Sequence, residues 1–112
     1  MKTNMPLTEE KKLTILVRVE PGCLGPEGAS HIEEFCRAAQ IEFASIESDV
    51  VHFQVEPRFD KSLAEIQYTI INRPITTEQA AKYMKMFNKD LDELEGHVYE
   101  KLAMLIDQYL ER

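Results

Sequence analysis

Three short segments in which every second residue is apolar constrain the fold most strongly. Residues 12–20, 51–56 and 64–71 show this period of two, which is typical of a β-strand with one buried face. A proline closely follows each segment and ends it. We predict three strands, of which the second and third form an antiparallel hairpin across the short loop at residues 57–61.

Apolar residues at helical spacing follow the first strand. Ser30 and Glu33 form a capping-box pattern, which predicts that a helix begins at Ser30 and ends near residues 41–44. Cys36 lies on the apolar side of this helix and is predicted to be buried, whereas Gln40 is predicted to face away from the core.

The last third of the chain has the pattern of helices. A second capping box, formed by Thr76 and Gln79, predicts a helix to about residue 88. Asp90 starts a further helical segment that reaches the C-terminus. The sequence leaves open whether the two segments are continuous, and Gly96 weakens the interior of the second by about 1 kcal/mol.

These elements predict an α+β protein in the order β-α-β-β-α-α. A small, three- to four-stranded, mostly antiparallel sheet is expected to pack against helices, with a long helix at the C-terminus. The fourth strand depends on residues 41–46, which fit either the last turn of the first helix or a short strand. A chain of 112 residues corresponds to one domain, which we assign to residues 11–112 after a flexible N-terminus at residues 1–10.

The charge of the chain limits its partners. The 20 acidic and 13 basic residues give a net charge of −7, and the lysines and arginines form no basic run. The chain is therefore not expected to bind nucleic acid or an anionic membrane surface. No apolar run approaches the roughly 20 residues that span a bilayer, and no secretory signal is evident, so we predict a cytoplasmic protein with reduced cysteines.

The C-terminal helix carries more apolar residues than one face of a small sheet is expected to cover. We therefore predict a homodimer with this helix in the interface. The alternative is that the helix folds back on the core of its own chain. The interface candidates are Leu94, Val98, Leu102, Leu105 and Tyr109.

The loop at residues 20–30 is the one segment with features of a chemical site. Cys23 lies between a strand end and a helix start, where exposed helix amides stabilise a thiolate, and His31 is the nearest base. This pair predicts thiol-dependent redox or sulfur-transfer chemistry as an alternative function. The negative charges of Glu20 and Glu27 disfavour a thiolate at Cys23 and so oppose this chemistry. The structural alternative is that Cys23 fills space in a turn.

Gly22, Gly25 and Gly28 are spaced as G-x-x-G-x-x-G before Ser30. Glycines allow a backbone to approach a ligand, and a helix N-terminus attracts anions, so a small-ligand sensor is a second alternative function. The spacing matches neither the Walker nor the dinucleotide pattern. The structural alternative is a turn that needs positive φ angles.

Residues 13–24 resemble the strand-to-helix turn of ACT-type regulatory domains, in which a Pro-Gly turn precedes the first helix and helps to bind an amino acid. The chain departs from that pattern because residues 25–29 are inserted before the helix and the final strand of the βαββαβ order is missing. We assign no family on this basis.

The remaining residues do not favour an enzyme. No constellation supplies a nucleophile, a base and electrophilic support together, and the three histidines do not group, so no metal site or cofactor is predicted. Phe59, in the loop after the second strand, is expected to pack into the core and would anchor a partner if exposed. The sequence predicts a small cytoplasmic, non-enzymatic interaction or regulatory module.

Overall fold

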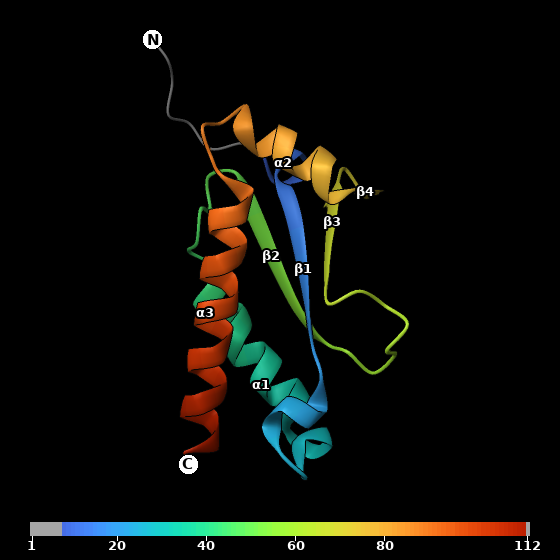
Figure 1. The fold of residues 1–112 in the computed structure, drawn as a ribbon, viewed down its shortest axis with the longest axis vertical. Coiled ribbons are helices and arrows are strands. Elements are labelled where there is room, and N and C mark those ends of the chain that lie inside the picture. The colour runs from blue at the N-terminus through green and yellow to red at the C-terminus, as the bar shows by residue number, and fades with distance from the viewer. Residues whose placement is uncertain (1–7, 112) are drawn as a thin grey trace.

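A mixed sheet of four strands forms the centre of the protein (Figure 1). The computed structural model describes residues 8–111, and its strands are β1 (Leu13–Val19), β2 (Val51–Pro57), β3 (Ile66–Ile70) and β4 (Arg73–Ile75). Their order across the sheet is β2-β1-β3-β4, with β1 parallel to β2 and antiparallel to β3. The predicted α+β class is confirmed, although the sheet is mixed and its fourth strand is β4, not residues 41–46.

The second and third strands are not neighbours, so the predicted hairpin between them is wrong. β1 lies between them because helix α1 (Gly28–Phe43) returns the chain in a crossover that places β2 parallel to one edge of β1. The segment from Arg58 to Glu65 then carries the chain to the other edge. Both of its ends are fixed on β1, since the Arg58 amide donates to the Val19 carbonyl and the Arg18 amide to the Glu65 carbonyl, each over 2.8 Å.

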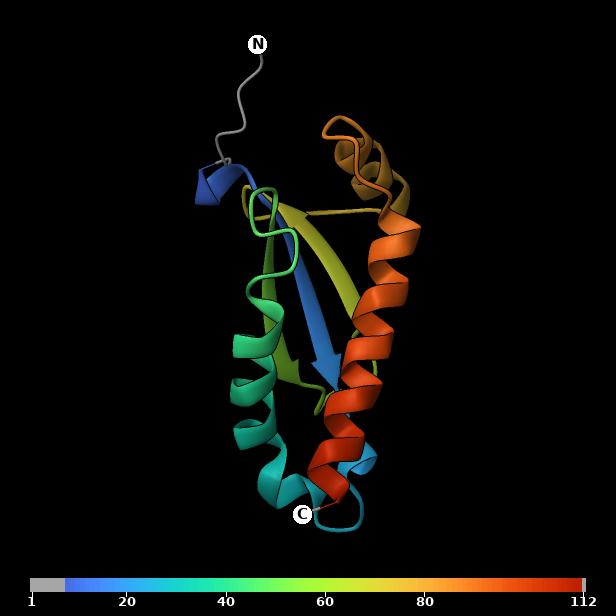
Figure 2. The same cartoon turned by 90° about the vertical axis from the view of Figure 1, so that its left-hand side faces the viewer.

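Helices α1 and α3 (Leu91–Leu110) cover the same face of the sheet and run in opposite directions (Figure 2). Helix α2 (Thr77–Lys85) closes the end of the sheet at which β1 begins (Figure 1). The alternating apolar residues of β1 and β2 are buried with the apolar sides of the helices in one core. The largest fully buried side chains are Phe43, Phe53, Leu13, Ile15, Ile32, Met84, Val19 and Val98.

Among the described residues, no helix covers the other face of the sheet. His52, Gln54 and Glu56 of β2 are exposed there, as the polar half of an alternating strand requires. Arg18 of β1 lies on this face and donates to the Gln67 side chain over 3.0 Å. The sheet is thus buried on one side only.

The first helix begins before Ser30, so the predicted capping box of Ser30 and Glu33 is wrong. α1 starts at Gly28, and the side chain of its N-cap residue, Glu27, makes no capping hydrogen bond. Backbone groups serve instead, since the Gly28 amide donates to the Gly25 carbonyl and the Ser30 amide to the Glu27 carbonyl, each over 3.0 Å. The turn before the helix supplies the partners that a capping side chain would provide.

The two C-terminal helices are separate. Thr76 caps α2 as predicted, and the Thr76 and Gln79 side chains each accept a hydrogen bond from the other residue's amide. Asn88, with a φ angle of 62°, turns the chain after α2. The Asp90 side chain then accepts hydrogen bonds from amides in the first turn of α3 and begins that helix.

Contacts at both ends hold α3 against its own chain. Val98 in its first half is 1% exposed, and the Tyr68 hydroxyl of β3 donates to Glu95 Oε2. Towards the C-terminus the ring of Tyr109 lies edge-on to the ring of Phe35, with centroids 5.7 Å apart. The inner side of this helix therefore folds back on the core of its own chain, as the alternative considered for it predicts, and the homodimer stays a prediction.

Part of the predicted flexible N-terminus, residues 1–7, lies outside the described residues. Glu9–Lys11 form a short 3₁₀ helix, η1, and the Tyr83 hydroxyl of α2 donates to the Lys11 carbonyl over 2.5 Å. Within residues 8–111, no helix combines the length and the apolar character needed to cross a bilayer.

A strained turn joins β3 to β4. Ile71 and Asn72 have φ angles of 51° and 63°, the left-handed conformation of a type I′ hairpin turn. Asn tolerates this conformation, but a β-branched residue adopts it rarely and at a cost. The Ile71 side chain is 58% exposed, so packing does little to offset that cost.

Replacing Ile71 by Asn is expected to raise the free energy of unfolding by about 1 kcal/mol, because Asn adopts positive φ with less strain. Urea titration of both proteins would measure the difference. Ile71→Val keeps the branched side chain and should give no such gain. An Ile71→Asn protein no more stable than Ile71→Val would contradict the strained turn.

Candidate functional site

Cys23 lies at the surface beyond the end of β1. It belongs to a short 3₁₀ helix, η2 (Pro21–Leu24), and its side chain is exposed. Together with Glu20 and Tyr99 it lines a hollow of about 190 Å³ between β1 and α3. In the described part of the chain, neither a histidine nor a second cysteine lines this hollow, so Cys23 has no imidazole base beside it there.

His31 lies in the first turn of α1, where its ring packs near the ring of Tyr109, with centroids 6.0 Å apart. Within residues 8–111 no hydrogen bond joins His31 to Cys23. The structure therefore does not form the nucleophile–base pair that thiol chemistry requires. Thiol chemistry at Cys23 stays a prediction without geometric support.

The glycines of this loop have structural explanations. Gly25 has a φ angle of 92°, and a Cβ atom on Gly28 would lie 1.7 Å from the carbonyl oxygen of Pro21. The amides of Cys23, Gly25, Gly28 and Ser30 all donate to carbonyls within the loop. Because these donors are already used, the loop offers few amides to an anion, and the turn interpretation fits it better than the ligand-binding one.

Gly28→Ala is expected to lower the free energy of unfolding by on the order of 3 kcal/mol, since the new methyl group overlaps backbone that cannot move without shifting α1. Gly22→Ala is the matched control, because a Cβ there meets nothing within 4 Å. Thermal and urea denaturation would compare them. Equal stability of the two variants would contradict the close backbone contact.

Cys36 is buried in the core side of α1, as predicted, with 3% of its surface exposed. Burial, together with the charges of Glu56 and Glu33, raises the pKa of its thiol to about 11. A thiol in this environment is protonated at neutral pH and shielded from reagents.

Iodoacetamide is therefore expected to modify Cys23 but not Cys36 in the native protein near pH 8, because only Cys23 is exposed. Intact-mass spectrometry should show one added group before denaturation and two after it. Rapid modification of Cys36 in folded protein would contradict its burial.

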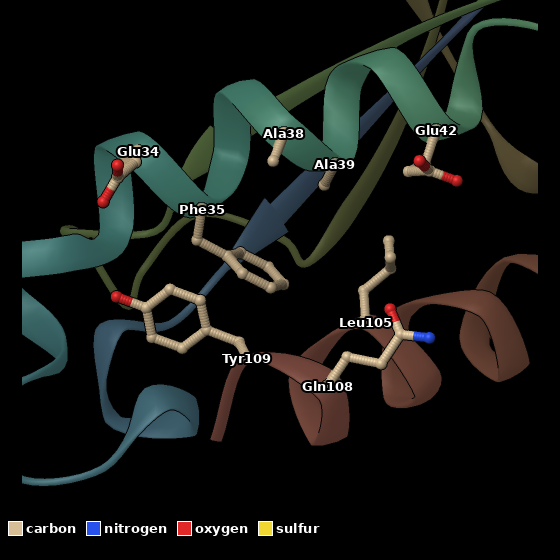
Figure 3. Close-up of a pocket in the computed structure, with 8 residues that line it drawn as sticks. All are labelled: Glu34, Phe35, Ala38, Ala39, Glu42, Leu105, Gln108 and Tyr109. Carbon is tan, nitrogen blue, oxygen red and sulfur yellow. The ribbon is translucent and has the colours of Figure 1, made fainter. Parts of the chain in front are cut away.

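A hollow of about 240 Å³ lies between α1 and α3 (Figure 3). The rings of Phe35 and Tyr109 and the side chain of Leu105 point into it, and Glu42 at its rim pairs with Lys101 over 3.4 Å. Its polar groups, from Glu34, Glu42 and Gln108, lie around the opening and do not converge on one point. The hollow suits an apolar contact better than a chemical reaction.

A wider groove of about 760 Å³ lies between α1 and the free edge of β2, and we call it the edge groove. Ile41 and Phe59 border it with 75% and 64% of their surfaces exposed. The residues that line it are Glu33, Cys36, Arg37, Gln40, Ile41, Val55, Glu56, Pro57 and Phe59.

The exposure of Phe59 shows that its predicted packing into the core is wrong. The loop that carries it is organised by Arg58, whose guanidinium donates to the carbonyls of Lys61 and Leu63 and pairs with Glu20 over 3.1 Å. These polar contacts hold the loop in a conformation that points away from the core. Phe59 therefore projects into solvent beside the edge groove, and an exposed Phe59 is expected to anchor a partner.

Gln40 is the residue that sequence reasoning missed. Instead of facing solvent, its side-chain amide donates to the Phe53 carbonyl over 2.6 Å and accepts from the Val55 amide over 2.8 Å. The Phe53 carbonyl and the Val55 amide point away from β1, at the free edge of β2. One residue of an added parallel strand would form hydrogen bonds with the same two groups. A glutamine on the polar side of a helix gives no sequence signal of this role.

The five predicted interface residues do not share one surface. Leu94 and Val98 are 6% and 1% exposed and belong to the core. Leu105 and Tyr109 line the hollow against α1, and Leu102 lies on the other side beside Cys23. The most exposed large apolar residues of α3 are instead Tyr99, Met104 and Leu110.

Within the described residues, no group of three or more His, Cys, Asp or Glu side chains is arranged to hold a metal ion. Comparisons with known protein families, curated proteins and solved structures gave no match. The geometry favours two surfaces for contact with other molecules, the C-terminal half of α3 and the edge groove.

Proposed function

We propose that this protein is a small, non-enzymatic interaction module that forms a homodimer through the C-terminal half of α3. The observation that carries this proposal is a row of apolar side chains that the chain's own core leaves partly uncovered. We call this row the α3 stripe, and it consists of Tyr99, Leu102, Ile106 and Leu110. Its members recur at steps of three and four residues, the spacing with which two helices pack together.

The sheet stops short of the α3 stripe. β3 begins at Ile66, which pairs with Val17, so the last residues of β1 have no strand beside them at that edge. Tyr99 and Leu110 accordingly remain 50% and 52% exposed. A second copy of the chain would remove these side chains from water, which favours association.

Negative charge opposes this association. Glu100 and Asp107 are exposed on the same helix, and each chain carries a net charge of −7. Added salt screens the repulsion between two such chains and leaves the apolar contact largely intact. The proposed dimer should therefore strengthen as ionic strength rises.

Sedimentation equilibrium is expected to show a wild-type dimer that dissociates on dilution and is stabilised by added NaCl. Tyr99→Glu and Leu110→Glu should each shift the protein to monomer, because they place a carboxylate within the α3 stripe. Met86→Glu is the matched control, since Met86 is an apolar residue 74% exposed at the end of α2, and it should stay dimeric.

Circular dichroism of all four proteins would establish that each is folded. A folded wild type that is monomeric at every concentration and salt level tested would refute the dimer. Equal weakening by Met86→Glu and Leu110→Glu would refute the assignment of the interface to α3.

We also propose a cytoplasmic location. Cys23 and Cys36 are unpaired thiols, which supports a compartment that keeps cysteines reduced.

A further inference from the structure

We infer that the edge groove binds an extended peptide segment of another protein, in which an apolar residue is flanked by lysine or arginine. The segment adds to the free edge of β2 and takes the hydrogen bonds that Gln40 makes in its absence. This inference concerns a different surface from the α3 stripe, and it holds whether or not the chain dimerises.

The groove is concave and offers an apolar surface to a side chain of the peptide. Cys36, Val55 and Pro57 line it, and the side chains of Ile41 and Phe59 stand at its margins. Exposed large apolar residues grouped around a concave surface mark contact sites more often than scattered ones do. An apolar side chain of the peptide would be enclosed between Ile41 and Phe59.

The strand edge supplies the main-chain contacts. The side-chain amide of Gln40 already forms hydrogen bonds with the Phe53 carbonyl and the Val55 amide, which shows that a planar amide fits against this edge. A peptide backbone presents the same donor and acceptor and would replace it one for one. The paired stretch is short, because the Val51 amide is bonded to the Glu47 carbonyl and Pro57 has no amide hydrogen.

The charge of the groove selects a basic partner. Glu33 and Glu56 line it, and their charges act on the Cys36 thiol, so their negative potential reaches its interior. Arg37 is the single cation among the described lining residues and leaves a net negative charge. A second copy of this chain, in two-fold contact at the groove, would bring the same carboxylates together, which is unfavourable.

A phage-displayed library of random dodecapeptides, selected on the full-length protein, would test the inference. The expected enriched sequences contain an apolar residue next to lysine or arginine, and synthetic versions should bind in fluorescence anisotropy with an affinity that falls as salt rises. Ile41→Ser and Phe59→Ser should each weaken this binding about tenfold, whereas Met86→Ser should not change it.

Two further variants separate the contributions of charge and strand edge. Glu33→Gln should weaken binding several-fold, and Glu34→Gln is its matched control, because Glu34 lies at the hollow between α1 and α3. Gln40→Ala should bind more tightly than wild type, since no side chain then competes for the edge of β2.

Several outcomes would overturn the inference. These are a library with no enriched sequences, enriched acidic sequences, or binding that persists unchanged in both Ile41→Ser and Phe59→Ser. Unchanged affinity in folded Gln40→Ala would refute strand addition. If the Phe59→Ser protein lost self-association and the Leu110→Glu protein retained it, the groove would bind a second copy of this chain and not a peptide of another protein.

Discussion

The central position of β1 is the constraint on which the rest of the structure depends. Both of its edges are hydrogen-bonded, to β2 on one side and to β3 on the other, and only one of its faces is fully buried. The helices must therefore cover the same face of a narrow sheet. α1 covers the part of this face that lies on β2, and α3 covers the rest of the same face. Because β3 is short, the second half of α3 has too little sheet beneath it to bury its apolar side fully.

Features that depend on neighbouring residues were predictable, whereas those that depend on distant segments were not. The caps at Thr76 and Asp90 and the bounds of the first strand follow from side chains close to the backbone they organise. The Ser30 cap was wrong because the helix begins two residues earlier, at Gly28, where loop carbonyls accept from the Gly28 and Ser30 amides. The strand order, the exposure of Phe59 and the role of Gln40 each require a crossover or a loop path that a periodic pattern does not encode.

The two candidate contact surfaces lie on opposite flanks of the helical layer. The edge groove borders the outer side of α1, the α3 stripe borders the outer side of α3, and the hollow containing Phe35 and Tyr109 separates the helices. Association of two chains along α3 therefore leaves the edge of β2 accessible. Such an arrangement would present two identical grooves on one particle, which increases the effective concentration of a second binding event with a repetitive partner.

The contact between Gln40 and β2 also bears on how this protein survives at high concentration. An unpaired strand edge is a template for growth of sheets between molecules, and natural proteins usually protect it with charges, bulges or a covering loop. Here much of that protection comes from one neutral amide on a neighbouring helix. Its loss would remove two hydrogen bonds but leave the hydrophobic core intact. At high concentration the main damage would therefore be association through β2 into insoluble protein that retains its helices.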